Sequence, residues 1–327
     1  MMDFDKAKAL VMGAEDDADL ALRNFGALPR ELSDLETARV AILPIPYDLT
    51  ASYRSGSRMG PRAIIEASHN MELYDEELDD IPARLGIHTL SELEVGGYGP
   101  ERMVEITEET VSGLLGAGKI VCSLGGEHTI TSGTVRAYAK AFPDLSVLCL
   151  DAHADLRDAY QGVRYSHACA MRRVREIVGR VSHIGVRSLS VGEAEHAKSE
   201  GIVLHEAASW TGSGEQLERI LEELGSGPVY VTCDLDVFDP AYVPSTGTPE
   251  PGGLSWNEVT DILREVAAER EIVGFDAVEL APISGFAASD FLAAKLVYKM
   301  IGYVLRREAG SGKEGPRARR KAGGSRS

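Results

Sequence analysis

The chain has 327 residues, of which 44% are hydrophobic, and this apolar content allows one large domain with a substantial core. No apolar run reaches the roughly 20 residues that a membrane helix needs, and the charged start does not resemble a signal peptide, so we expect a cytoplasmic protein. The net charge is −17, and residues 1–305 hold 26 basic and 49 acidic residues (−23), which disfavours nucleic acid as a partner and favours cationic ligands.

Strands and helices alternate in the first half of the chain. Residues 1–36 contain a helical stretch and no residues that indicate chemistry, so we expect an N-terminal arm that packs on the body. A strand is predicted at residues 40–43, and Pro61 opens a helix after a glycine-containing turn. A helix at residues 101–115, with apolar residues at helical spacing, leads to a strand at residues 120–124.

The second half of the chain continues this alternation from a strand at residues 145–150. The further predicted elements are a helix at residues 168–177, a strand at 181–186, a helix at 192–199, a strand at 202–204, a helix at 214–224, a strand at 229–233, a helix at 256–268, a strand at 272–278 and a helix at 289–307. Ser255 and Glu258 form a capping-box pair at the start of the helix at residues 256–268.

This order of elements predicts the fold class. Strands that are apolar without alternation are buried on both faces, as in parallel sheets covered by helices. We therefore expect an α/β fold in which residues 37–306 form a three-layer α/β/α sandwich with a central, mainly parallel sheet. Residues 307–327 are rich in Gly, Arg and Lys and are expected to form a disordered basic tail. Four cysteines are predicted to be buried free thiols: Cys122, Cys149, Cys169 and Cys233.

Polar residues of the kind that bind metals follow four of the predicted strands. The strand at residues 145–150 runs into Asp151-Ala152-His153-Ala154-Asp155, and a continued strand would place the two aspartates and the histidine on one face. Taken alone, this motif is equally typical of a polar strand end whose groups bond to neighbouring amides. The ends of the other three strands carry His128, then Asp234 and Asp236, and then Glu279. Because open parallel sheets bind ligands beyond their carboxyl ends, we expect all of these residues to converge.

The candidate ligands are too many for one ion: His128, Asp151, His153, Asp155, Asp234 and Asp236. With Asp151 and Asp234 as bridges, they would hold two divalent ions roughly 3.5–4 Å apart. Oxygen-rich coordination favours Mn²⁺ over Zn²⁺, with Ni²⁺, Co²⁺ and Fe²⁺ as alternatives. A glycosidase-like carboxylate pair at Asp234 and Asp236 would leave both histidines unexplained.

Three motifs together resemble the ureohydrolases, the family of arginase, agmatinase and their relatives. They are Gly-Gly-Glu-His at residues 125–128, Asp-Ala-His-Ala-Asp at 151–155 and Thr-Cys-Asp-Leu-Asp-Val-Phe-Asp-Pro at 232–240. With shorter matches elsewhere, the resemblance covers residues 38–306. It implies two Mn²⁺ ions per subunit in an α/β/α fold, a homotrimer or homohexamer, and attack of hydroxide on a guanidinium carbon that releases urea and an amine.

The resemblance also implies roles for single residues. His128, Asp151, Asp155 and Asp234 would hold one ion, and Asp151, His153, Asp234 and Asp236 the other. Asp155 would orient the hydroxide and pass its proton to the leaving amine, and His167 would shuttle protons. Glu279 would bind the planar guanidinium group through charge-assisted hydrogen bonds.

The substrate is predicted from departures from the arginase pattern. Ser188 stands where arginases have an aspartate that binds the α-amino group, and the loop after Asp155 offers Arg157, Asp158 and Tyr160 as substrate-binding residues. This favours a small cationic guanidino compound, agmatine or N1-aminopropylagmatine, over arginine. A guanidinobutyrase, in which Arg157 or Arg164 turns inward, and a guanidine hydrolase remain alternatives. A catalytically silent regulatory subunit is a further one, although such a protein is expected to have lost a ligand.

Overall fold

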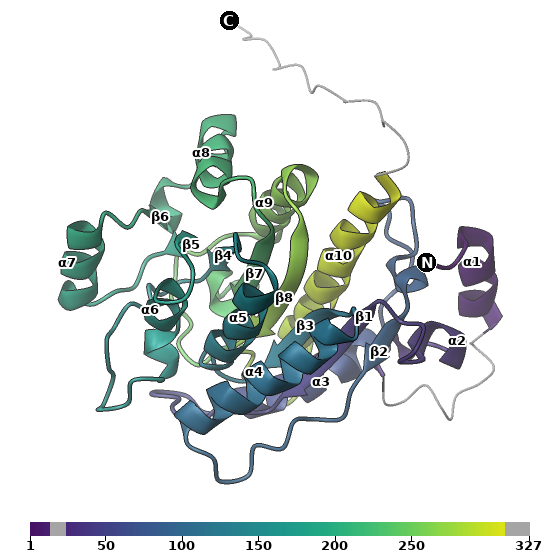
Figure 1. Cartoon of the computed structure of the whole chain (residues 1–327), viewed down its shortest axis with the longest axis horizontal. Helices are drawn as coiled ribbons and strands as arrows, with labels where there is room; N and C mark the ends of the chain where they lie inside the picture. Colours follow the sequence, from purple (N-terminus) through teal and green to yellow (C-terminus); the bar gives the residue numbers. More distant parts are fainter. Residues whose placement is uncertain (14–23, 311–327) are drawn as a thin grey trace, which may run out of the picture.

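The structure is a computed structural model that describes residues 1–13 and 24–310, with residues 306–310 described by backbone alone. Its centre is a sheet of eight strands in the order β2-β1-β3-β8-β7-β4-β5-β6 (Figure 1). The strands are β1 (Val40–Ile45), β2 (Ile87–Thr89), β3 (Ile120–Gly125), β4 (Ser146–Leu150), β5 (Arg180–Val186), β6 (Leu204–Glu206), β7 (Val229–Asp234) and β8 (Ile272–Val278). All neighbouring strands pair in parallel, as predicted.

Helices cover both faces of this sheet (Figure 1). They are α1 (Phe4–Gly13), α2 (Arg30–Ser33), α3 (Gly60–Ser68), α4 (Pro100–Gly116), α5 (Ile130–Ala141), α6 (Ala170–Arg175), α7 (Val191–Glu200), α8 (Gly214–Leu224), α9 (Trp256–Glu269) and α10 (Ala288–Gly310). Residues of α3, α8, α9 and α10 pack in one apolar cluster, and residues of α4, α5, α6 and α7 pack in a second. Successive strand residues alternate between the clusters, so Ile42 joins the first and Leu43 the second. The predicted three-layer sandwich is confirmed.

Local signals in the sequence account for several helix boundaries. The capping box of Ser255 and Glu258 at the start of α9 is confirmed, and Ser190 and Glu193 form a second one at the start of α7 that was not predicted. Two short strands at the edges of the sheet differ from the prediction. Strand β2 was missed, and β6 begins two residues later than expected because Ile202 is the turn residue whose N–H donates to Ala197 O.

The N-terminal arm packs on the body of the protein, and the last helix is longer than predicted. In the predicted N-terminal arm, Phe25, Leu28 and Leu32 are buried in the same apolar cluster as α3 and α10. Helix α10 continues to Gly310, beyond the predicted end of the last helix at Arg307. The rest of the predicted basic tail, residues 311–327, lies outside the described residues, as do residues 14–23 of the arm. The four cysteines are buried and free, as predicted.

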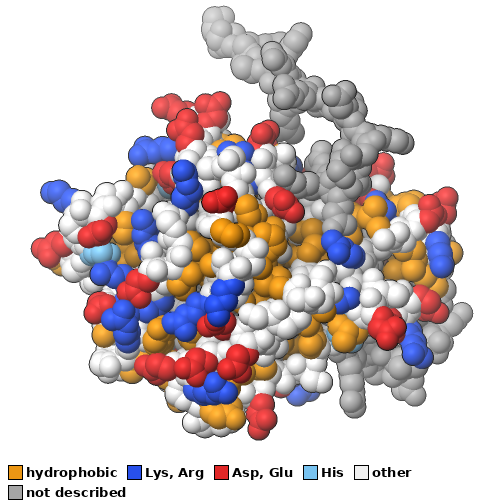
Figure 2. Space-filling model, viewed as in Figure 1, with side chains coloured by type: hydrophobic (Ala, Val, Ile, Leu, Met, Phe, Trp, Pro, Cys, Tyr) orange, Lys and Arg blue, Asp and Glu red, His pale blue; other side chains and the backbone are white. Residues whose placement is uncertain are grey.

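The surface carries charges of both signs. Figure 2 shows acidic and basic side chains interspersed over the face viewed there, so no field of one sign covers that face. Among residues 1–13 and 24–310, no helix has the length and apolar character that crossing a membrane requires.

Candidate metal centre and substrate pocket

The carboxyl ends of β3, β8, β7 and β4 lie side by side in the sheet, and the predicted site residues follow them. The turn after β3 carries His128, β7 ends in Asp234, and β8 is followed by Glu279. Asp236 lies in the short 3-10 turn that begins at Leu235, where its N–H donates to Asp234 Oδ1 (2.9 Å). Parallel strands bring residues more than a hundred positions apart to one edge, as the sequence predicted.

The segment Asp151 to Asp155 is not the strand that the alternation predicted. Strand β4 ends at Leu150, and Asp155 has a φ of +51°, a left-handed conformation that a strand cannot contain. A continued strand would separate the two aspartates by roughly 13 Å, at about 3.3 Å per residue. The turn instead brings both carboxylates to the same histidine, so the predicted residues converge for a different geometric reason.

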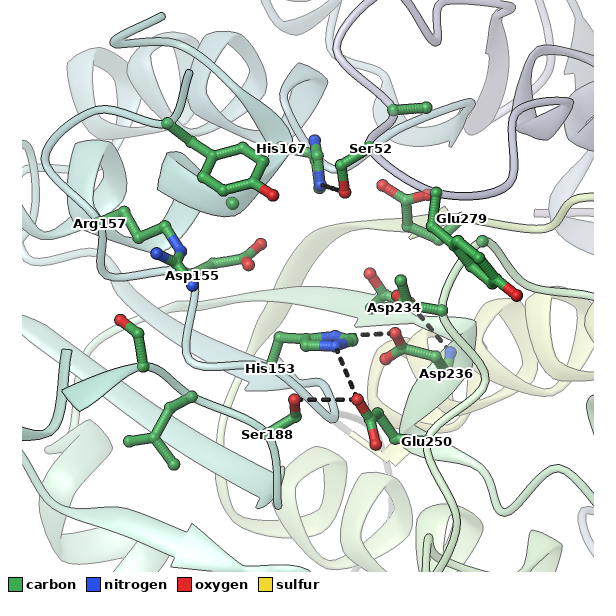
Figure 3. Close-up of a pocket in the computed structure, with 18 of the residues that line it drawn as sticks. Ser52, His153, Asp155, Arg157, His167, Ser188, Asp234, Asp236, Glu250 and Glu279 are labelled. Carbon is green, nitrogen blue, oxygen red and sulfur yellow. Dashed lines mark hydrogen bonds and ion pairs between the residues drawn. The ribbon is translucent and has the colours of Figure 1, made fainter. Parts of the chain in front are cut away.

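Two histidines share the carboxylate of Asp151. Its Oδ2 lies 3.2 Å from His128 Nδ1, and its Oδ1 lies 3.6 Å from His153 Nδ1. Asp155 Oδ2 and Asp234 Oδ2 also approach His128 Nδ1, at 3.2 and 3.5 Å. Asp236 Oδ2 approaches His153 Nδ1 at 2.9 Å (Figure 3). The six predicted ligands therefore form two adjoining groups, one around each imidazole.

The buried state of these groups fits divalent ions. His128 Nδ1 and Asp151 Oδ2 are buried and make no hydrogen bond within the described residues, which is costly unless a cation binds them. Burial, followed by the neighbouring Asp151 carboxylate, raises the pKa of Asp155 to about 7. Burial opposes a charge on His128, but the carboxylates of Asp151 and Asp155 outweigh it and raise its pKa well above the usual range. A cation bound among these carboxylates would relieve their mutual repulsion.

A buried carboxylate orients His128 through a threonine. His128 Nε2 lies 2.9 Å from Thr232 Oγ1, and Thr232 Oγ1 donates to Asp276 Oδ1 at 2.6 Å. Asp276 Oδ2 accepts further hydrogen bonds from Tyr230 and Thr131, at 2.8 Å each. With the hydrogen on Nε2, the lone pair of Nδ1 points at the three carboxylates, the orientation that a metal ligand needs. Thr232 and Asp276 were not predicted as site residues, although a polar residue inside an apolar strand was the available signal.

Glu250 lies on the side of the His153 ring that faces away from Asp236 Oδ2. His153 Nε2 is 3.9 Å from Glu250 Oε1, and that oxygen accepts a hydrogen bond from Ser188 Oγ at 3.0 Å (Figure 3). The backbone oxygen of Glu250 is held by the Arg187 guanidinium group. Glu250 was not predicted as a site residue.

Four of the six candidate ligands line a cavity of about 320 Å³: His153, Asp155, Asp234 and Asp236. Its lining includes most of the other predicted site residues: Arg157, Tyr160, His167 and Glu279. It also includes residues that were not predicted: Ser52, Tyr53, Arg54, Ser188, Glu193 and Glu250. Asp158 does not line the cavity. Its side chain is 66% exposed and pairs with Arg173 (2.8 Å) and Arg164 (3.4 Å), so it lies outside the pocket in which it was expected to contact substrate.

Two of the lining residues come from the loop after Asp155. The guanidinium group of Arg157 lies over the Tyr160 ring at 5.0 Å and approaches Glu193 Oε2 at 3.6 Å. Arg157 therefore faces the pocket with an acidic neighbour beside it, whereas Arg164 pairs with Asp158 and Glu176 outside the pocket.

Glu279 is fixed by its backbone and by one carboxylate oxygen. It has a φ of +67°, and its N–H donates to Gly126 O at 2.7 Å. Its Oε1 accepts the backbone N–H of His128 at 2.8 Å. Burial, followed by the charge of Glu127, raises the pKa of Glu279 well above its usual range. A partly buried carboxylate that lines the pocket, on a strained backbone, is suited to binding a cationic group of a ligand.

Comparisons with known proteins match nearly the same part of the chain as the sequence resemblance, residues 38–306. The model of the arginase family matches residues 38–302. An N(1)-aminopropylagmatine ureohydrolase of Thermus thermophilus is 41% identical over 268 residues, which cover 82% of this chain and 90% of that protein. The agmatinase of Bacillus anthracis is 38% identical over 274 residues, covering 82% and 93%. The crystal structure of the agmatine ureohydrolase of Thermoplasma volcanium matches with a TM-score of 0.80 at 32% identity, over 90% of this chain and 99% of that one.

Proposed function

Because this chain belongs to the arginase family, we propose that it is a binuclear-metal hydrolase that cleaves the guanidinium group of agmatine or N1-aminopropylagmatine. The products would be urea and putrescine or spermidine, which places the reaction in polyamine biosynthesis. The observation that carries this proposal is the buried Asp151 carboxylate, which faces one imidazole with each oxygen, beside a pocket that His153 and Glu279 line.

The proposed metal is Mn²⁺, with two ions per chain. The ligands would be the six residues around the two imidazoles: His128, Asp151, His153, Asp155, Asp234 and Asp236. Four carboxylates and two imidazoles make an oxygen-rich donor set, which suits Mn²⁺ better than Zn²⁺. A pair of divalent ions supplies hydroxide near neutral pH, which makes water a strong enough nucleophile for a guanidinium carbon.

The protein groups bind the substrate and move protons. Glu279 accepts hydrogen bonds from the guanidinium group, and the opposite charges hold that planar group over the floor of the pocket. Asp155 accepts a hydrogen bond from the nucleophile and passes a proton to the leaving amine. His167 lines the same pocket and moves protons between it and solvent. Burial, followed by the charges of His153 and His128, lowers the pKa of His167 to about 4, so its ring is neutral at neutral pH and one ring nitrogen keeps its lone pair.

The substrate proposal depends on the outer part of the pocket. Ser188 donates to Glu250, and both side chains line the cavity, so this wall offers a carboxylate to a cationic tail. The position of Arg157 favours guanidinobutyrase as an alternative, because Arg157 lines the pocket and an anionic substrate tail would pair with its guanidinium group. Its contact with Glu193 already provides a partner for that charge, so we favour the cationic substrates.

A urea-release screen tests the substrate class. The Mn²⁺-loaded protein would be assayed with agmatine, N1-aminopropylagmatine, arginine, guanidinobutyrate and guanidine, and kcat/KM compared. We expect one of the first two to have the highest value. If guanidinobutyrate has the highest kcat/KM and this value decreases in the Arg157→Met variant, the pocket accepts an anionic substrate tail. If none of the five compounds releases urea, the proposed function is refuted.

Metal removal tests the reaction type. Chelated protein should lose activity and regain it with Mn²⁺, and elemental analysis should give two ions per chain. The variant Asp236→Asn should bind fewer ions, because it removes the carboxylate nearest His153 Nδ1. Full activity in protein shown to be free of metal would contradict a binuclear hydrolase.

We also propose a homotrimer or homohexamer in the cytoplasm. The family relationship supports the oligomer, and light scattering on the purified chain would measure its mass. The buried free thiols support a reducing compartment.

A further inference from the structure

Glu127 is a buried carboxylate that the proposed reaction does not use. It is 0% exposed, and its hydrogen bonds come mainly from one residue, Thr50. The Thr50 backbone N–H donates to Oε2 at 2.6 Å, and the Thr50 hydroxyl donates to Oε1 at 2.7 Å. Thr129 Oγ1 also donates to Oε1, at 2.7 Å. Burying a carboxylate is costly, and here the carboxylate fixes the Thr50 hydroxyl in one orientation.

The orientation of Thr50 determines which hydrogen-bonding role it offers to His167. A hydroxyl has one hydrogen and two acceptor positions, and the hydrogen of Thr50 is directed at Glu127. Its oxygen therefore accepts the backbone N–H of His167 at 3.0 Å and lies 3.2 Å from His167 Nδ1. An acceptor at this distance favours the hydrogen on Nδ1. Ser166 Oγ, at 3.3 Å from the same nitrogen, is the other hydroxyl close to Nδ1.

The other ring nitrogen of His167 faces the pocket. Its Nε2 lies 3.3 Å from Ser52 Oγ, and both residues line the cavity (Figure 3). Thr50 and Glu127 do not line it, so neither is placed to contact a substrate there. The edge of the ring packs against Tyr160, with ring centroids 6.0 Å apart, which limits its rotation.

We propose that Glu127 and Thr50 are positioning residues that keep the hydrogen of His167 on Nδ1 and leave the lone pair of Nε2 directed into the pocket. The catalytic consequence of this placement rests on the proposed function. When a water in the pocket loses a proton, the electron pair of the broken O–H bond stays on oxygen and the proton joins the lone pair of Nε2. The ring then becomes a cation, which Glu127 stabilises through Thr50, and Nε2 returns the proton to solvent.

The tautomer can be measured without any assay of turnover. The full chain, with ¹⁵N-labelled histidine and saturated with diamagnetic Zn²⁺ in place of Mn²⁺, would be studied by NMR, and the His167 signals assigned with His167→Asn. We expect hydrogen on Nδ1 in the wild type and in Thr50→Ser, which keeps the hydroxyl. Thr50→Val should lose this preference. Hydrogen on Nε2 in the wild type, or an unchanged ring in Thr50→Val, would overturn the proposal.

A double-mutant cycle then connects the tautomer to the reaction. In Mn²⁺-loaded enzyme, Thr50→Val and Glu127→Gln should lower kcat about tenfold or more, a part of the 10²–10⁴ that acid–base groups contribute, with KM little changed. Neither substitution should lower kcat further when combined with His167→Ala, and Thr50→Ser should retain activity. Additive losses would refute a role through His167.

Metal content and wild-type activity separate the possible failures. Elemental analysis should find two ions per chain in Thr50→Val, and a loss of metal there would overturn the proposal in favour of a structural role. A wild type that releases no urea from any guanidino compound refutes the proposed function, while the NMR result still decides the placement of the hydrogen. An active wild type with an unaffected Thr50→Val refutes the inference alone.

Discussion

Replacing Thr232 by Val should weaken metal binding while the fold persists. The substitution keeps the shape of the side chain and removes the hydroxyl between His128 Nε2 and Asp276 Oδ1, which lie 2.9 and 2.6 Å from it. In the metal-bound protein, Nδ1 of His128 must keep its lone pair for the ion, so Nε2 must carry the hydrogen. That buried N–H would then have no acceptor, at a cost of about 1–3 kcal/mol.

This cost falls on the bound state more than on the free state. Without metal, Nδ1 carries a hydrogen and lies 3.2 Å from the carboxylates of Asp151 and Asp155, and the ring can release the hydrogen on Nε2 when the Thr232 hydroxyl is removed. Since about 1.4 kcal/mol is a tenfold change in affinity, the dissociation constant for Mn²⁺ should rise roughly 5-fold to 150-fold. Removing the hydrogen-bond partner of a metal-ligating histidine typically weakens metal affinity about 10-fold to 100-fold, which lies within this range.

Competition with a fluorescent chelator would measure the Mn²⁺ dissociation constant. Thr232→Ser retains the hydroxyl and should bind like the wild type. Thr134→Val is the matched control, because it removes another buried hydroxyl, one that donates within α5 to Ile130 O. Circular dichroism and urea unfolding would show that all variants are folded. An unchanged dissociation constant in Thr232→Val, or an equal rise in Thr134→Val, would refute the reasoning.

Three further substitutions have defined outcomes. Glu279→Gln should keep both Mn²⁺ ions and lower kcat/KM about 100-fold or more, because the guanidinium group loses its charged partner; unchanged turnover would remove Glu279 from the site. Asp158→Asn should leave kcat/KM unchanged, since its exposed side chain pairs outside the pocket. Burial, followed by the charge of Arg175, lowers the pKa of His183 to about 3. Between pH 6.5 and pH 3, His183 is therefore protonated in the unfolded chain only, and the free energy of unfolding decreases as the pH is lowered. In His183→Leu, the decline of unfolding free energy between pH 6.5 and 5 should be shallower, by up to roughly 1.4 kcal/mol per pH unit.

The sequence predicted the parts of the site that depend on strand order. An apolar strand followed by Asp or His is a local pattern, and the parallel sheet brings such strand ends together whatever lies between them. The path of residues 151–155 was not predictable in this way. Period-two alternation placed them on a strand, whereas the left-handed Asp155 is set by the loop that follows and by Asp155 O, which accepts the N–H of Arg172.

Side-chain direction in loops was the second limit. Arg157 and Asp158 are neighbours, and both were expected to contact substrate, yet one faces the pocket and the other pairs with Arg173. Residues that act through another side chain were missed for a different reason. Asp276 lies inside an apolar strand, and its partners on β7 and α5 are 44 or more positions away, so only the folded sheet shows what it holds.

The place of β8 in the sheet determines when this chain can become a metalloprotein during synthesis. Strand β8 lies between β3 and β7, so His128 is on one side of it and the carboxylates of Asp151 and Asp234 are on the other. Until residue 278 has left the ribosome, the nascent chain holds two part-sheets, each with an open apolar edge of the kind that chaperones protect. Insertion of the last strand closes both edges and joins the two halves of the metal site in one step. Metal capture is therefore a late folding event, and a chain truncated before Ile272 is expected to aggregate instead of binding ions weakly.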